Sequence, residues 1–87
     1  MLVERARMLV EKACSTGCLR EDCEKLAVIT ETLEEALSET GGWGMELGLL
    51  SIAGYLREAA RVAWARGCRG ESKALMEAAA LLEAVAR

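Results

Sequence analysis

The sequence predicts an all-α protein, a four-helix bundle built from two antiparallel helical hairpins in up-down-up-down order. Hydrophobic residues make up 53% of its 87 residues, and many are Ala and Leu, which lose little conformational entropy in a helix. Aromatic residues make up only 3%, without any Phe, so the composition gives a sheet little support. The chain contains no Pro that would interrupt a helix. Its length predicts a single domain over residues 1–87.

The first predicted hairpin joins a helix over Leu2–Cys14 to a helix over Leu19–Thr40. Apolar residues recur at helical spacing in the first helix, at Leu2, Ala6, Leu9 and Ala13. The second helix carries a seam with alternating steps of four and three residues: Leu19, Cys23, Leu26, Thr30, Leu33 and Leu37. Gly17 predicts the end of the first helix, because Gly enters the left-handed conformation without a Cβ clash.

The second predicted hairpin joins a helix over Met45–Arg66 to a helix over Glu71–Ala86. We expect Trp64 to belong to the core, and Gly67 to end the first of these helices. The last helix shows an apolar stripe, with Ser72 or Gly70 as its N-terminal cap; the stripe is Leu75, Ala78, Ala79, Leu82 and Val85. Short connections make consecutive helices antiparallel neighbours.

Charge and missing residue types exclude several function classes. The chain has no His, which removes imidazole acid/base chemistry and imidazole metal sites. Its net charge of −3 argues against a nucleic-acid partner. The early charges and the short uncharged run, 47–56, indicate neither a signal peptide nor a membrane span, so we expect a cytoplasmic protein without a membrane partner. The absence of Asn and Gln fits a thermophilic source, and equally a GC-rich genome.

The four cysteines are the feature with the most chemical content. Cys14 closes the first predicted helix, Cys18 and Cys23 flank the start of the second, and Cys68 lies in the second hairpin's turn. In an up-down-up-down bundle these positions meet at one pole. We therefore predict structural disulfides, with Cys14–Cys23 and Cys18–Cys68 as the preferred pairing of the three possible. Such disulfides are rare in the mesophilic cytosol and common in hyperthermophiles.

Two other interpretations of the same cysteines stay open. Four thiolates are the right number for a zinc site or an iron–sulfur cluster, and the ligands would be Cys14, Cys18, Cys23 and Cys68. Their spacing matches no familiar knuckle or ferredoxin motif. Alternatively they are unpaired thiols used for packing. A thiol redox protein fits less well, because Glu21, Asp22 and Glu24 would oppose a thiolate at Cys23.

The first half of the third predicted helix indicates self-association. Residues 45–56 are apolar nearly all round, which is typical of a helix in a core or an interface. The candidate interface residues are Trp43, Leu47, Gly48, Leu50 and Gly54. Trp43 stands between two glycines, where it either anchors a partner or folds back over the bundle. Small residues such as Gly48 and Gly54 permit close helix approach within the bundle or across a dimer.

Two charged surfaces allow both a structural and a functional interpretation. Glu31, Glu35 and Glu39 follow one another at steps of four residues, and we expect a solvated face there and not a docking face for a basic partner or a cation. Basic residues gather toward the end of the third helix, at Arg57, Arg61, Arg66 and Arg69, where cations are favourable near a helix C-terminus. The alternative for them is contact with an acidic partner, a phosphate or the acidic face of the second helix in another subunit.

The sequence names no specific function and shows no catalytic motif or cofactor site, so we do not expect an enzyme. It favours a small structural or interaction module, stabilised by disulfides, that binds itself or another protein. A metal protein with four cysteine ligands, or a thiol redox protein, is the alternative.

Overall fold

The structure is a computed structural model that describes residues 2–15, 17, 23–38 and 45–86, with side chains for all of these except 2, 3, 30, 32–38 and 45–47. Within these ranges the chain forms helices and turns and no strand, so the predicted all-α class is confirmed for them. The four helices of the described ranges are α1 (Leu2–Ser15), α2 (Cys23–Ser38), α3 (Met45–Ala65) and α4 (Arg69–Ala86).

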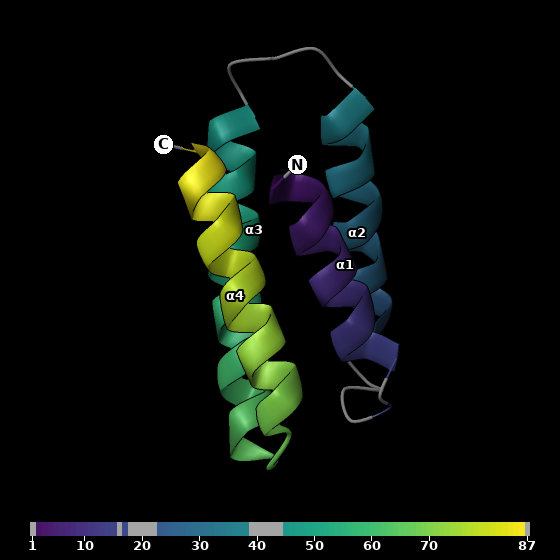
Figure 1. Cartoon of the computed structure of the whole chain (residues 1–87), viewed down its shortest axis with the longest axis vertical. Coiled ribbons are helices and arrows are strands. Elements are labelled where there is room, and N and C mark those ends of the chain that lie inside the picture. Colours follow the sequence, from purple (N-terminus) through teal and green to yellow (C-terminus); the bar gives the residue numbers. More distant parts are fainter. Residues whose placement is uncertain (1, 16, 18–22, 39–44, 87) are drawn as a thin grey trace.

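Three helix pairs form the main packing interfaces, and together they make a compact helical bundle. α3 packs against α4, α4 packs against α1, and α1 packs against α2 (Figure 1). α1 and α4 therefore each pack against two neighbours, whereas α2 and α3 each have one main packing partner. In Figure 1 the end of α1, the start of α2 and the turn between α3 and α4 lie toward the same end of the molecule.

The core is built mainly from Ala and Leu. Its largest fully buried side chains come from all four helices: Val10, Leu26, Leu56, Leu75 and Leu82. Each such side chain contributes about 1.5–3 kcal/mol when it is removed from water. The remaining buried positions are mostly Ala, including Ala6, Ala53, Ala60 and Ala79. Small side chains at these positions let the helices approach one another closely.

The turn between α3 and α4 closes both helices through backbone hydrogen bonds. Gly67 has a φ of 85°, in the left-handed region that the sequence predicts for it. The Cys68 amide donates to the Ala63 carbonyl at 2.8 Å, and the Gly67 amide donates to the Trp64 carbonyl at 3.0 Å. This pair of bonds is a Schellman motif, which satisfies carbonyls at the end of α3. The Ser72 amide then donates to the Cys68 carbonyl, so α4 starts directly after the turn.

Three boundaries and three side chains differ from the sequence predictions. α1 ends at Ser15 and not at Cys14. α3 ends at Ala65 and not at Arg66, and α4 begins at Arg69 and not at Glu71, because the turn is tighter than expected. Neither Gly70 nor Ser72 is the cap, because both lie inside α4. Ser72 is buried there, and its hydroxyl donates to the Ala60 carbonyl of α3 at 2.7 Å. Trp64 is not a core residue, since 57% of it is exposed, and Val85 is 36% exposed. The predicted ends of the second helix, at residues 19–22 and 39–40, lie outside the described residues.

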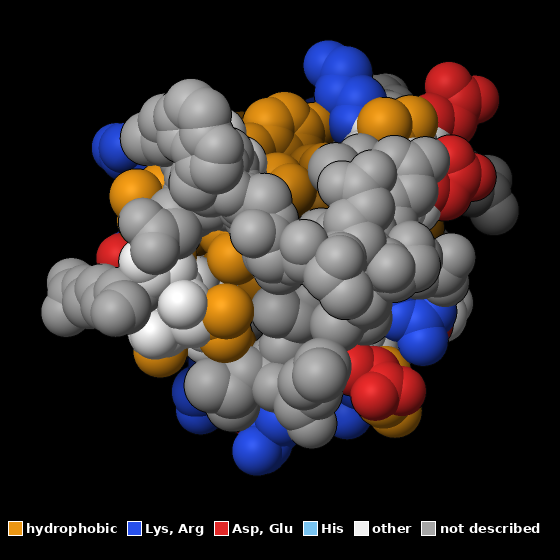
Figure 2. All heavy atoms as spheres, turned by 90° about the horizontal axis from the view of Figure 1, so that it is seen from above, with side chains coloured by type: hydrophobic (Ala, Val, Ile, Leu, Met, Phe, Trp, Pro, Cys, Tyr) orange, Lys and Arg blue, Asp and Glu red, His pale blue; other side chains and the backbone are white. Residues whose placement is uncertain are grey.

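Charged side chains lie toward the edge of the molecule. Figure 2, the view from above, shows described Lys, Arg, Asp and Glu side chains at the periphery, and described hydrophobic side chains both nearer the middle and at the edge. Among the described residues, none of the helices has the length and apolar character that crossing a membrane requires.

Candidate functional site at the disulfide pole and the helix grooves

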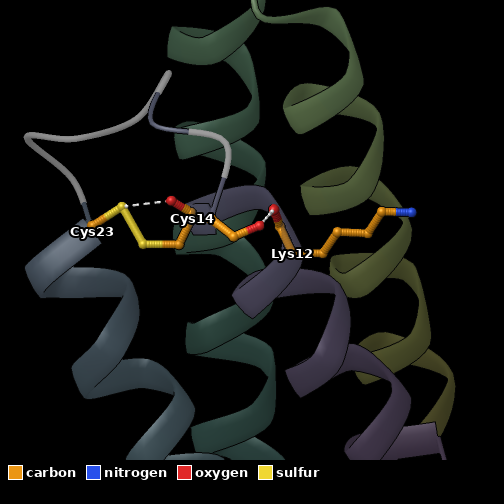
Figure 3. Close-up of a disulfide and its surroundings, with 4 residues drawn as sticks. Lys12, Cys14 and Cys23 are labelled. Carbon is orange, nitrogen blue, oxygen red and sulfur yellow. Dashed lines mark hydrogen bonds between the residues drawn. A yellow bond between two sulfur atoms is a disulfide. The ribbon is translucent and has the colours of Figure 1, made fainter.

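A disulfide joins the end of α1 to the start of α2. Cys14 and Cys23 are bonded through sulfur, with their Cα atoms 5.5 Å apart (Figure 3). That separation is within the usual range for a disulfide. This is the pairing that the predicted hairpin favours for these two residues. The Cys23 sulfur also lies 3.4 Å from the Cys14 carbonyl oxygen, but an oxidised sulfur carries no hydrogen, so this contact is not a hydrogen bond.

The local sequence explains why the two sulfurs meet. Cys14 is in the last turn of α1, and Cys23 is the first residue of α2. The Ser15 hydroxyl donates to the Lys12 carbonyl at 2.8 Å, which satisfies an acceptor at the helix end. Gly17 follows with a φ of 80°, in the conformation that turns the chain away from the helix axis.

A groove of about 520 Å³ lies beside this disulfide, between α1 and α2. Its apolar wall comes from Val10, Leu26 and Ala27, and its carboxylates are Glu11 and Glu31. Glu11 already forms an ion pair with Arg7 at 3.2 Å, one helical turn away. The groove therefore offers a weakly acidic surface with no thiolate nucleophile beside it, because both cysteine sulfurs here are oxidised.

Cys68 is at the turn between α3 and α4. It is 4% exposed, belongs to the hydrophobic core, and is disulfide-bonded. Its predicted partner, Cys18, lies outside the described residues. The described cysteines thus sit at the two turns where the sequence places them.

The alternative metal site gains no geometry from the described residues. Within those ranges no three Cys, Asp or Glu side chains come together in a way that could hold a metal ion. Cys14 and Cys23 are joined to each other, and a sulfur in a disulfide cannot act as a thiolate ligand.

In the first half of α3, where self-association is predicted, the exposed surface is only partly apolar. Leu49, Ala53 and Leu56 point into the core, whereas Leu50 is 46% exposed. Gly48, Ser51 and Gly54 fill other outward positions. A methyl group added at Gly48 or Gly54 would meet no other atom within 4 Å, so close helix packing inside the described chain does not require these glycines. Trp43 and the Leu47 side chain lie outside the described residues.

A second groove, of about 330 Å³, separates α2 from α3. Its walls are apolar except for one cation and two hydroxyls: they are Lys25, Val28 and Ile29 on α2 and Ser51, Ile52 and Tyr55 on α3. Val28 is 61% exposed. This groove lies along the same half of α3 as Leu50, but Leu50 does not line it. At about 100° per residue, the α3 residues of the groove point to a different side of the helix from Leu50.

A third groove, of about 480 Å³, lies between α3 and α4 near their turn, and sequence reasoning missed it. Trp64 and Met76 form its exposed apolar part. The Arg69 guanidinium lies over the Trp64 ring, 5.0 Å from its centroid, in a cation–π contact. The available signal was Trp64 followed by a cation at Arg69, five residues later and across a glycine turn.

Ion pairs account for part of the basic surface on α3. Arg57 pairs with Glu83 of α4, which ties these two helices together. Arg61 lies 3.8 Å from Glu58 one turn earlier, and both side chains are largely exposed. Between α1 and α4, Arg5 lies 3.7 Å from Glu77. Exposed pairs of this kind stabilise a protein by less than about 1 kcal/mol each.

The fold and these surfaces define a small, disulfide-linked helical domain with apolar grooves between its helices. Comparison with known proteins found no family model that matches the chain, no similar curated protein and no similar solved structure. Its function therefore has to be argued from its own surfaces.

Proposed function

We propose that the protein is a disulfide-stabilised interaction module of the cytoplasm, without catalytic activity, that associates with a second copy of itself through the first half of α3. The observation that carries this proposal is Leu50, a large apolar side chain left 46% exposed on the helix with the most apolar first half. Gly54 is one turn further on the same face, with open space around it. The apolar groove between α2 and α3 gives the same half of the helix a second apolar surface, on another side.

A homodimer through this half of α3 would cover apolar side chains that the single chain leaves exposed. Leu50 of α3 and Val28 of α2 are exposed by 46% and 61%, and partly buried Ile29 and Ile52 line the groove beside Val28. Two such surfaces that face each other would remove these side chains from water, which is the main favourable term in association. A twofold pair would use the same patch on both subunits.

Leu50→Glu tests the interface. We expect the natural chain to have a dimeric mass by light scattering at micromolar concentration, and Leu50→Glu to have a monomeric mass, because a buried unpaired carboxylate is costly. Met8→Glu is the matched control: Met8 is a similarly exposed apolar residue, on α1, and its substitution should leave the dimer intact. A monomeric mass for the natural chain, or equal dissociation of both variants, contradicts the proposed interface.

We further propose the up-down-up-down order of two hairpins, with Cys18–Cys68 as a second disulfide across them. The buried, oxidised Cys68 and the packing of α3 on α4 support this arrangement.

Alkylation under denaturing conditions without reductant tests the pairing. Two double variants should take up no alkylating label, because each leaves one intact disulfide: Cys14→Ser/Cys23→Ser and Cys18→Ser/Cys68→Ser. Cys14→Ser/Cys18→Ser should take up two labels, since it leaves two unmatched thiols. Labelling of the natural chain without reductant would contradict the disulfides, and zinc or iron in that sample would favour the alternative site with four cysteine ligands.

A further inference from the structure

The groove between α3 and α4 combines an apolar floor with a cationic rim. Its floor is formed by Ala60, Trp64 and Met76, and the Ser72 hydroxyl in it already donates to the Ala60 carbonyl. Trp64 and Met76 are 57% and 44% exposed, although side chains of this size remove much apolar area from water when they are covered. The floor thus presents an apolar surface without an unsatisfied hydroxyl.

Three cations surround this floor. Arg61 and Lys73 line the groove from opposite helices, and Arg69 lies over the Trp64 ring. The Arg61 side chain is 80% exposed, and its 3.8 Å contact with Glu58 is an exposed pair of little strength. Arg61 can therefore exchange that contact for another carboxylate at low cost.

The charge of this groove is opposite to that of the whole chain. The chain has a net charge of −3, yet residues 60–76 contain four cations, Arg61, Arg66, Arg69 and Lys73, and one acid, Glu71. Glu71 lines the neighbouring groove between α1 and α4, and Lys73 borders both grooves. A positive groove on an acidic protein selects an anionic partner and disfavours a basic one.

We propose that the groove binds an acidic helical segment of another protein, which inserts one apolar side chain against Trp64 and Met76 and places carboxylates on Arg61 and Lys73. Arg61 lies on α3 and Lys73 lies on α4, so the apolar floor has a cation on each side. An amphipathic helix that carries carboxylates on both sides of an apolar side chain would place one carboxylate near each cation. This site is distinct from the proposed self-association face, because it uses the second half of α3 and the first half of α4.

A peptide titration tests this proposal. The probe is a synthetic helical peptide of Glu and Leu, with two matched controls: one with Lys in place of Glu, and one with Ser in place of Leu. Trp43→Phe leaves Trp64 as the single tryptophan, because the chain contains two, so its fluorescence reports the groove. We expect the acidic peptide to shift Trp64 emission, and both control peptides to bind about tenfold or more weakly.

Variants of the groove separate recognition from folding. Arg61→Glu/Lys73→Glu should weaken binding of the acidic peptide by about tenfold or more, and should strengthen binding of the Lys peptide. Trp64→Ala should also lose the acidic peptide, measured by the anisotropy of a labelled probe. Lys25→Glu, a charge reversal on α2, should leave the affinity unchanged. Circular dichroism melts should show all three variants folded, since each altered side chain is largely exposed.

Several outcomes would overturn the proposal. The first is that the acidic peptide and the Lys peptide bind with equal affinity. The second is that Lys25→Glu weakens binding of the acidic peptide as much as Arg61→Glu/Lys73→Glu does. The third is that the acidic peptide does not bind at any accessible concentration. Binding to anionic phospholipid vesicles without peptide binding would assign the groove to a membrane surface instead. If Arg61→Glu/Lys73→Glu converts a dimer to a monomer while Leu50→Glu does not, the occupant is a second copy, and the proposed interface on the first half of α3 fails as well.

Discussion

Glycine affects stability in opposite ways at two positions: Gly54, inside α3, lowers the stability of the fold, and Gly67, just beyond the end of α3, supports it. Gly67 has a φ of 85°, a conformation that costs any residue with a Cβ about 1 kcal/mol. Gly54 lies inside the helix. Because Gly is more flexible than Ala in the unfolded chain, fixing it in a helix costs more conformational entropy and lowers the stability of the fold. Neither site is crowded, since an added Cβ would meet no atom within 4 Å. Backbone conformation alone therefore decides the sign of each substitution.

We predict that Gly67→Ala lowers the free energy of unfolding by about 1 kcal/mol, and that Gly54→Ala raises it by about 0.5–1 kcal/mol. Urea denaturation of both variants measures this, and a Leu50→Glu background removes any contribution from self-association. A stabilising Gly67→Ala would show that the turn between α3 and α4 does not need the left-handed conformation.

Ser72 is the only buried polar residue among the described side chains, and its hydroxyl fastens α4 to α3. Ser72→Ala removes one buried hydrogen bond while Ala gains slightly in helix propensity, so we expect a net loss of about 0.5–1 kcal/mol. The exposed Ser51 of α3 provides the control, since Ser51→Ala gains only the propensity. Thermal melts compare the two; equal effects would mean that the Ser72 bond contributes no net stability.

At the scale of elements, α2 has one main packing partner. Leu26 is its fully buried side chain among those described, and Ile29 is partly buried. Its main packing partner is α1, to which the Cys14–Cys23 bond fixes its first residue. The disulfide therefore adds a covalent link to the packing of α2 on α1.

We predict that Cys14→Ser/Cys23→Ser increases amide hydrogen exchange in residues 23–38 more than in α3 and α4. Removal of the bond lets α2 separate from α1 without opening the rest of the core, which is a local unfolding event. Exchange measured by mass spectrometry on peptides from each helix tests this. Uniform acceleration in all helices would show that α2 unfolds only together with the whole bundle.

Sequence reasoning predicted the helices well and the roles of single side chains less well. Periodicity of three and four residues placed all four helices, because it reflects the backbone geometry of the helix itself. Trp64 and Ser72 were misassigned because their roles depend on how α3 and α4 cross, which no pattern within one helix specifies. The pairing of Cys14 with Cys23 was predictable, since a short turn between antiparallel helices leaves few other positions for the two sulfurs. The groove at Trp64 was not, because its walls come from two helices.

For the whole molecule, the Cys14–Cys23 bond restricts the unfolded chain. Its sequence separation is nine residues, for which loop-closure entropy gives a stabilisation of about 2.5 kcal/mol. That amount is comparable to the net stability of roughly 3–5 kcal/mol that a single core of this size provides. The disulfide is therefore a major contributor to the stability of the bundle and not an accessory to it.

We predict that reductant lowers the midpoint of thermal unfolding markedly, and that Cys14→Ser/Cys23→Ser lowers the free energy of unfolding by about 2–3 kcal/mol. Three samples are compared: the variant, the natural chain with reductant, and the natural chain without reductant. Chemical denaturation measures the free energy of unfolding of each sample, and thermal melts measure the midpoints. Identical midpoints in all three samples would mean that the bond adds no stability.

The contact between α1 and α4 has a consequence for the order in which the bundle can form. Translation delivers α1 before its neighbour α4, which begins more than fifty residues after α1 ends. Until then, the inward side of α1, with Ala6 and Val10, lacks α4 and has α2 as its main neighbour. Contacts between distant parts of a chain slow folding relative to a bundle made only of adjacent helices. On the ribosome the first hairpin therefore waits, incompletely covered, for the last helix to emerge.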